Sequence, residues 1–291
     1  MYESFYGLAA RPFELTPNPR YLFLSTSHAE ALTTLEYAWV RHGLTLLIGD
    51  AGTGKTTLVY AALQAQRRDT TLSVLLTNPA LARDEFFDYL AFGFGLSRDA
   101  AGSKSRCLRE LSQSLAERHA AGTASALIID EAQSLSDALL EEIRLLGNIE
   151  TPTERLLSII LIGQPELADR LNAPAMRQLK QRVSLRCTLS PLDLAETAAY
   201  ISTRIRVAGG DGATVFAPEA IEGIYRASGG VPRVVSVICD NALITGFALK
   251  QRPVGTEVVD EVCRDLGIEP VSDDETAVSA AAVPPQRFSF F

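Results

Sequence analysis

The sequence of 291 residues has no apolar run long enough to cross a membrane, and its start, MYESFYGL, lacks the basic and then apolar segments of a secretory leader. A membrane helix needs about 18 or more consecutive apolar residues. A leader would show a positively charged stretch followed by an apolar one. These absences predict a protein that does not span a bilayer, although they leave room for a peripheral association with one.

Cysteine is scarce, and its four copies are scattered with no C-x-x-C pair and no histidine cluster beside them. Neither a disulfide framework nor a zinc site is therefore expected, and a reducing compartment fits best. Positive charge is limited as well, with a formal net charge of -8 and a pI near 5.1. This balance excludes a protein coated with nucleic acid and permits only a local basic patch.

Short apolar runs alternate with helical stretches in the first two thirds of the chain. Such runs are typical of buried parallel strands, and they cover residues 44–48, 72–77, 126–129, 157–162 and 183–189. The alternation predicts an α/β fold whose parallel sheet is covered by helices on both faces. After residue 190 four helical stretches follow one another without a strand, which predicts a separate all-α subdomain.

The chain is accordingly expected to have four parts. The last of them mixes acidic, small and proline residues, which bury too little apolar surface to offset the entropy of ordering. The parts are a lead-in that packs on the core over residues 1–42, the α/β core over 43–190, a helical lid over 191–268 and a disordered tail over 269–291.

The stretch GDAGTGKT has the pattern and the context of a phosphate-binding loop, because an apolar strand precedes it and a helix follows. Its glycines allow consecutive N–H groups to point at one anion, and the helix adds its positive end. Lys55 supplies a charge for the β and γ phosphates, and the Thr56 hydroxyl is a ligand for Mg²⁺. The residues expected at the nucleotide are Gly49, Asp50, Ala51, Gly52, Thr53, Gly54, Lys55, Thr56 and Thr57.

Two carboxylates, Asp130 and Glu131, end the apolar run 126–129. Ligands of open α/β sheets bind at the carboxyl ends of the strands. We expect Asp130 to hold Mg²⁺ through water and Glu131 to orient and polarise the attacking water. The alternative is that the pair merely caps the next helix. The acidic pair and the absence of N-K-x-D argue against a guanine-specific GTPase.

Further motifs accompany the loop: the lead-in YESFYGLAARPFELTPNPRYLFLSTSHAEAL, then DEAQSLSDALLEEIRLLGNIET, IILIGQPEL and MRQLKQRV. Over about residues 1–268 the combination resembles the ExeA/GspA group of bacterial AAA+ ATPases. The resemblance implies an AAA+ P-loop core with a parallel five-stranded sheet, an all-α lid, and hydrolysis of ATP with Mg²⁺. It also implies a homo-oligomer, ring or filament, in which one subunit completes its neighbour's site.

Three site residues follow from this resemblance. Gln164 corresponds to the sensor-1 residue near the γ-phosphate, although it is also placed to cap a helix beginning near Pro165. Arg233, in GGVPR, corresponds to the sensor-2 arginine of the lid, with a solvated arginine at a helix start as the alternative. His28 corresponds to a position near the adenine, or else lies at the surface of a first helical turn.

The resemblance also implies an arginine finger, a guanidinium from the neighbouring subunit that stabilises charge on the γ-phosphoryl group. Arg177 and Arg182 lie where the family pattern has it. Of the two we favour Arg182, while either arginine is also placed to pair with glutamates of its own surface.

The resemblance implies a motor or switch that acts on protein partners in secretion or cell-envelope assembly. Longer members continue into a membrane span and a peptidoglycan-binding domain, neither of which is in the sequence, so a cytoplasmic or peripheral inner-membrane location is expected. The family is also related to transposition regulators of the TnsC, MuB and IstB kind, so a DNA-binding ATPase is an alternative function. In that case Arg204, Arg206 and Arg226 would form a small basic face for DNA. A slowly hydrolysing, nucleotide-gated scaffold is the third alternative.

Overall fold

The computed structural model describes residues 1–66 and 70–268, so the tail predicted over 269–291 lies outside the described residues. Contacts between residues divide the chain into two compact units. One is the α/β unit, residues 17–190. The other, which we call the helical unit, combines residues 1–16 with the chain from Pro191 onward.

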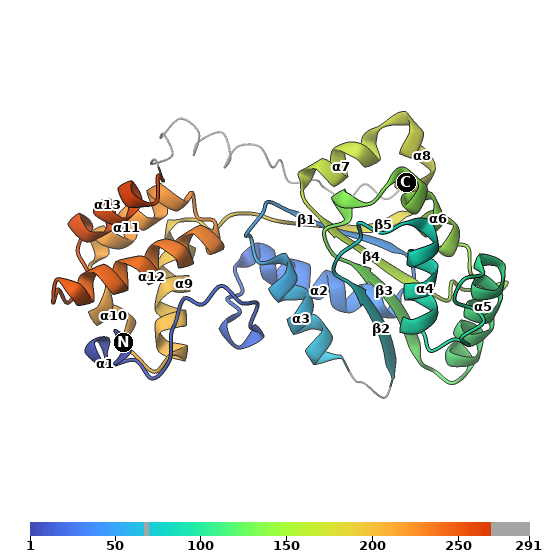
Figure 1. Cartoon of the computed structure of the whole chain (residues 1–291), viewed down its shortest axis with the longest axis horizontal. Coiled ribbons are helices and arrows are strands. Elements are labelled where there is room, and N and C mark those ends of the chain that lie inside the picture. The colour runs from blue at the N-terminus through green and yellow to red at the C-terminus, as the bar shows by residue number, and fades with distance from the viewer. Residues whose placement is uncertain (67–69, 269–291) are drawn as a thin grey trace. The chain divides into compact units, whose positions relative to one another are not determined.

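The α/β unit is built on a parallel five-stranded sheet, as the sequence predicts (Figure 1). Its strand order is β2-β3-β4-β1-β5. Each predicted apolar run forms one strand, with ends shifted by no more than two residues. The strands are β1 (Leu44–Gly49), β2 (Thr71–Leu76), β3 (Ala124–Ile129), β4 (Ser158–Gly163) and β5 (Val183–Leu189).

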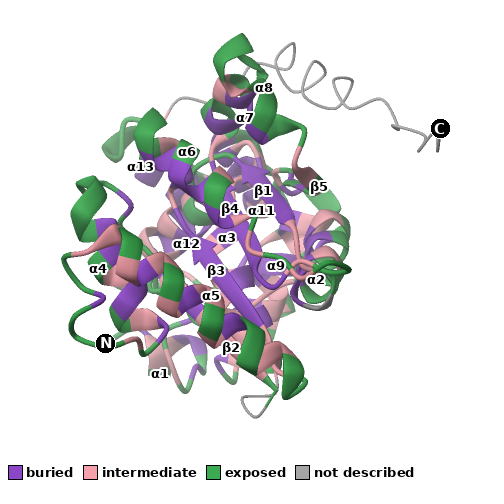
Figure 2. Cartoon of the chain, turned by 90° about the vertical axis from the view of Figure 1, so that its right-hand side faces the viewer, coloured by how far each residue is buried: buried purple, intermediate pink, exposed green. Residues whose placement is uncertain are grey.

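Both faces of the sheet are covered, so β1 and β4 are buried along their whole length, as Figure 2 shows. Successive side chains of a strand point to opposite faces, and Leu46 and Leu47 accordingly enter two different hydrophobic clusters. One face is packed by α2 (Thr26–Val40) and α3 (Lys55–Ala65). The other is packed chiefly by α4 (Arg83–Gly93), α5 (Lys104–Ala120), α6 (Asp137–Leu146) and α7 (Pro165–Asn172).

A predicted helix over residues 175–181 is shorter in the structure. A 3₁₀ turn, Pro174–Met176, comes first, and the single turn α8 (Arg177–Lys180) follows it. Pro174 opens the 3₁₀ turn, since its fixed φ suits a first helical position.

The helical unit contains the four predicted helices, with the caps that their sequences indicate. Asp193 accepts a hydrogen bond from the Glu196 N–H at 2.7 Å at the start of the first, and Pro218 and Pro232 occupy first-turn positions of two others. The four are α9 (Leu194–Val207), α11 (Pro218–Ser228), α12 (Pro232–Ala248) and α13 (Thr256–Asp265). Among the described residues, the short helices α1 (Glu3–Tyr6) and α10 (Gly212–Val215) also belong to this unit.

The predicted lead-in is divided between the two units, which corrects the expectation that all of residues 1–42 packs on the core. Residues 1–16 belong to the helical unit because their aromatic side chains are buried there, with Tyr6 fully buried and Phe13 1% exposed. The Arg204 guanidinium donates hydrogen bonds to the carbonyls of Pro12 and Glu14 at 2.5 and 3.0 Å. Arg204 is only 9% exposed, so it cannot belong to a basic face that contacts DNA.

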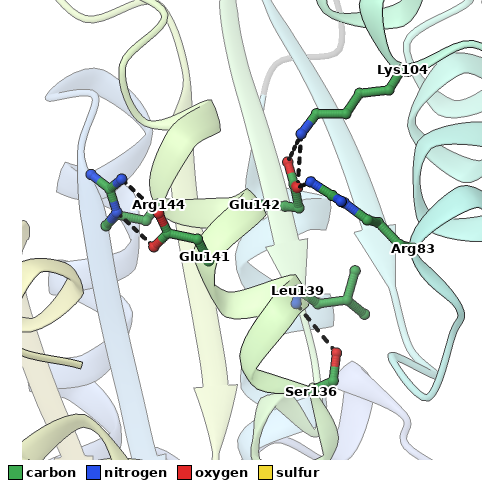
Figure 3. Close-up of polar contacts among 7 residues, drawn as sticks. All are labelled: Arg83, Lys104, Ser136, Leu139, Glu141, Glu142 and Arg144. Atoms are coloured by element: carbon green, nitrogen blue, oxygen red, sulfur yellow. Dashed lines mark hydrogen bonds and ion pairs between the residues drawn. The ribbon is translucent and has the colours of Figure 1, made fainter. Parts of the chain in front are cut away.

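An ion cluster joins the helices of one face to each other (Figure 3). The Glu142 carboxylate on α6 is 3% exposed and pairs with Arg83 at the start of α4 and with Lys104 at the start of α5. The Lys104 ammonium also lies 5.5 Å from the centre of the Phe87 ring. On the same helix, Arg144 makes two hydrogen bonds to the exposed Glu141, at 2.7 and 2.8 Å.

We predict that changing Arg83 and Lys104 together to alanine lowers the free energy of unfolding by about 3–5 kcal/mol, because a buried carboxylate loses both cations. Urea denaturation measures the change. Glu141→Ala, which breaks the pair with Arg144 at its exposed partner, is the matched control and should leave the midpoint unchanged. Equal midpoints for the double variant and this control would show that the buried cluster does not fasten α4 and α5.

Candidate functional site

The loop between β1 and α3 has the curled backbone that the sequence predicts. Gly52 and Gly54 have φ of 83° and 96°, values that glycine adopts without the steric cost of a Cβ. The Thr53 hydroxyl donates to the Asp50 carbonyl at 2.9 Å and closes the turn. The first N–H satisfied at the start of α3 is that of Leu58, which bonds the Gly54 carbonyl at 3.0 Å. The preceding N–H groups of the helix are therefore donors available to an anion.

Lys55 is buried inside this loop, with 6% of its surface exposed. Its ammonium donates to the carbonyls of Gly49 and Asp50, at 2.7 and 2.9 Å. The pKa of Lys55 is lowered, chiefly because burial disfavours the charged form, while the carboxylates of Glu131 and Asp130 act in the opposite direction. A bound polyphosphate would stabilise the charged ammonium, so the burial of Lys55 fits an anion site.

The two predicted metal ligands meet in the structure. The Thr56 hydroxyl, in the first turn of α3, donates to Asp130 Oδ2 at 2.7 Å. Asp130 follows β3 directly, is 5% exposed, and its other oxygen accepts from the Glu131 N–H at 2.9 Å. A hydroxyl and a carboxylate in contact supply oxygen ligands of the kind that Mg²⁺ prefers.

Glu131 has a left-handed backbone conformation, with φ 52° and ψ 37°. Side chains other than glycine adopt this region at a cost, and such strain gathers at functional sites. The alternative in which the acidic pair caps the following helix is not observed, since the side chain of Ser136 caps α6 and Glu131 makes no side-chain cap. The strained turn instead directs the Glu131 carboxylate to two glutamines.

Gln164 and Gln133 are those two glutamines, and both donate to Glu131 Oε2, with Gln164 at 3.4 Å. Gln164 begins α7 without forming a side-chain cap, contrary to the alternative in which it only caps that helix. Gln133 also accepts from the Gln164 N–H at 3.1 Å. Sequence reasoning missed Gln133, although it lies in the same DEAQ stretch two residues after Glu131. A Cβ at Gly163 would approach Gln133 Oε1 to 3.0 Å, so the glycine that ends β4 leaves room for this amide.

His28 contacts the phosphate loop itself. Its Nε2 lies 2.9 Å from the Thr53 carbonyl, and its Nδ1 lies 2.7 Å from the hydroxyl of Ser25, the residue that caps α2. A carbonyl only accepts, so Nε2 carries the hydrogen and donates it to Thr53. The histidine, 3% exposed, fastens α2 to the loop. Its predicted place beside the adenine stays a prediction.

The predicted arginines differ in what surrounds them. Arg177 is exposed at the start of α8. Arg182 is half-buried, and its Nη1 donates a hydrogen bond to the carbonyl of Gly147 at 3.2 Å. Gly147 is the residue that follows α6. Arg233 is exposed in the first turn of α12, within the helical unit. The roles of all three as finger or sensor stay predictions.

Comparison with known proteins agrees with the fold. Residues 40–171 match the model of a family described as an AAA domain. The solved structure of the Aeropyrum pernix ORC2 protein superposes with a TM-score of 0.64 at 16% identity, covering 94% of this chain and 74% of that one. The chain therefore has an AAA+ P-loop core followed by an all-α subdomain.

The resemblance to the ExeA/GspA-type AAA+ ATPases is confirmed as well. General secretion pathway protein A of Aeromonas hydrophila is 40% identical over 249 residues, which are 85% of this chain and 45% of that protein. ATP-dependent target DNA activator B of Escherichia phage Mu is 31% identical over 134 residues, 46% of this chain and 40% of that protein. The chain thus spans less than half the length of either relative. None of its described helices is both long and apolar enough to cross a membrane.

We predict that His28→Ala loosens the phosphate loop, because the buried Thr53 carbonyl loses its donor, at a cost of about 1–3 kcal/mol. Hydrogen exchange of the amides of residues 50–55 should accelerate, and the denaturation midpoint should fall. Thr33→Ala, at an exposed position of the same helix, is the control and should change neither. Unchanged exchange in His28→Ala would refute the fastening role.

Proposed function

We propose that the protein is an Mg²⁺-dependent ATPase of the AAA+ class, which binds and hydrolyses ATP at the loop between β1 and α3. The observation that carries the proposal is one constellation: a buried Lys55 in a curled loop, with Thr56 and Asp130 in contact and Glu131 beside them. The name of the phage Mu relative, an ATP-dependent activator, and the nucleotide complexes of the ORC2 structure support ATP as the ligand.

Each residue has a distinct part in this proposal. The N–H groups before Leu58 and the Lys55 ammonium bind the phosphates, and the ammonium exchanges its two carbonyl acceptors for phosphate oxygens. Thr56, and Asp130 through water, would hold Mg²⁺, which when bound would neutralise charge at the phosphates. Glu131 accepts hydrogen bonds from the attacking water and orients it. Gln133 and Gln164 hold the Glu131 carboxylate in place until substrate binds.

We further propose that ATP gates assembly of a homo-oligomer, which acts as a motor or switch on a protein partner. The support is the relative named for the general secretion pathway, whose identity extends over 85% of this chain. Secretion or cell-envelope assembly is therefore the favoured setting. The phage Mu relative supports a second candidate, a DNA-binding regulator, although it covers only 46% of the chain.

A DNA-binding regulator requires a protein surface that binds the phosphates of DNA. The affinity of such a surface for DNA falls steeply as the salt concentration rises. The net charge of -8 and the burial of Arg204 inside the helical unit weigh against it. Salt-sensitive binding of duplex DNA in the presence of ATP would favour that candidate. Salt-insensitive or absent binding favours a protein partner.

We predict that Glu131→Gln keeps affinity for Mg-ATP and slows turnover by about 10²–10⁴-fold, because an amide does not accept the proton of the attacking water. Phosphate release and equilibrium binding measure the two quantities. Lys55→Ala is the matched variant and should lose tight binding, since the charge clamp is gone. Wild-type turnover in Glu131→Gln would assign the water-positioning role elsewhere.

The arginine finger has its own prediction. The exposure of Arg177 and the hydrogen bond from Arg182 to Gly147 favour Arg177 over the residue that the sequence favoured. Mixing Arg177→Ala with Glu131→Gln subunits should restore ATPase activity, because each intact site then receives a guanidinium from its neighbour. The same mixture with Arg182→Ala is the comparison. Light scattering checks that the mixed assemblies form. If they form but have no ATPase activity with either arginine variant, neither Arg177 nor Arg182 acts as a finger in trans.

A further inference from the structure

The α/β unit has a cavity of about 790 Å³ at the end of the sheet opposite the phosphate loop. Residues that come just before β1, β2, β3 and β4 line it, so it lies at the amino ends of these strands, whereas the loop and Asp130 lie at the carboxyl ends. Its volume falls in the range of about 300–1,000 Å³ that is usual for small-molecule sites. The proposed ATPase site uses none of its residues.

The walls of the cavity carry a concentration of basic groups. Arg41 and His42 come from the chain after α2, His119 from the end of α5, and Arg155 from the approach to β4. Two of the chain's three histidines are therefore in this one cavity. Glu154 is the carboxylate among the lining residues, and His119 Nε2 lies 3.2 Å from it. Threonine hydroxyls at positions 70, 71, 123 and 153 add neutral donors.

His42 is held in an unusual conformation. Its φ is 29°, in the left-handed region that side chains other than glycine seldom adopt. Its ring meets the His119 ring edge-on, with 6.1 Å between the centres. Ser158 gives its hydroxyl hydrogen to the Ala38 carbonyl at 2.9 Å, so at 3.2 Å it accepts from His42 Nδ1–H. Nε2 is consequently the nitrogen of His42 that gains a proton.

We propose that this cavity binds a small anion with a doubly charged phosphate-like group, held by Arg155, Arg41 and the imidazoles of His42 and His119. Guanidinium and imidazolium donors together with hydroxyls are the groups that recognise such an oxyanion. The volume accommodates a phosphorylated small molecule rather than the bare ion alone. The site is independent of the proposed ATPase activity.

Binding at this site is linked to protons. Burial is the main cause that lowers the pKa of His42, and His119 lowers it further, while Glu154 acts in the opposite direction. Among the described residues that line the cavity, the other charged side chains are Arg41 and Arg155. An anion bound beside His42 favours its imidazolium form, so binding takes up a proton. Affinity therefore rises as pH falls and is lost as pH rises through the pKa of the occupied site.

Sulfate is the probe, because it stays a dianion across the pH range used, and chloride keeps the ionic strength constant. The chain has one tryptophan, Trp39, and it lines the cavity, so its fluorescence reports occupancy. Imidazole NMR of the three histidines locates the ion: His42 and His119 report the cavity, and His28 reports the phosphate loop through Thr53. At pH 6 sulfate should change the Trp39 emission and shift both cavity histidines. Affinity should fall by about tenfold or more between pH 6 and pH 8.

Arg155→Gln should weaken sulfate binding at pH 6 by about tenfold or more, whereas Arg98→Gln, at an exposed arginine outside the cavity, should not. His119→Gln is the second variant if Arg155→Gln fails to fold, and it should weaken sulfate binding at pH 6 while it keeps the fold. Three results would each overturn the proposal: sulfate shifts only His28, Arg155→Gln and Arg98→Gln bind alike, or affinity does not change with pH.

Discussion

The hydrogen bond from Thr56 to Asp130 is the contact on which the site depends. It joins the first turn of α3 to the end of β3, although β4 lies between β1 and β3 in the sheet. The contact therefore bridges a neighbouring strand, and its geometry requires that β1, β4 and β3 keep their parallel register. Gly163, which ends β4, leaves the space that the side chains of Gln133 and Leu167 occupy. A hydroxyl and a carboxylate are thereby brought together by the buried sheet and not by the flexible loop alone.

The surrounding structure holds the loop and the acidic turn from different sides. His28 anchors the loop to α2 through Thr53. Gln133 and Gln164 hold Glu131, and Arg170 donates to the Gln133 carbonyl at 2.7 Å. The ion cluster around Glu142 fastens α4 and α5 to α6, the helix that follows the acidic turn. In the proposed ATPase, these contacts would hold Lys55, Thr56, Asp130 and Glu131 in place through groups that need not touch the substrate, as electrostatic catalysis requires.

The sequence predicts the sheet well because buried parallel strands read as uninterrupted apolar runs, and all five appear in the structure. The conformation of the loop and the position of the acidic pair can also be predicted, since each depends on residues adjacent in the chain. Contacts between segments distant in the chain cannot be predicted in this way. Nothing local indicates that Tyr6 and Phe13 bury in the helical unit, that Arg204 turns inward, or that His28 bonds the Thr53 carbonyl. The basic cavity was missed for the same reason, because its walls come from segments far apart in sequence.

The most direct test of the nucleotide site is a crystal structure with Mg²⁺ and a non-hydrolysable ATP analogue. We predict that the Lys55 ammonium leaves the carbonyls of Gly49 and Asp50 for phosphate oxygens and that the Thr56 hydroxyl becomes a metal ligand beside Asp130. Phosphates bound elsewhere, with Lys55 still on its two carbonyls and Thr56 still donating to Asp130, would contradict the account.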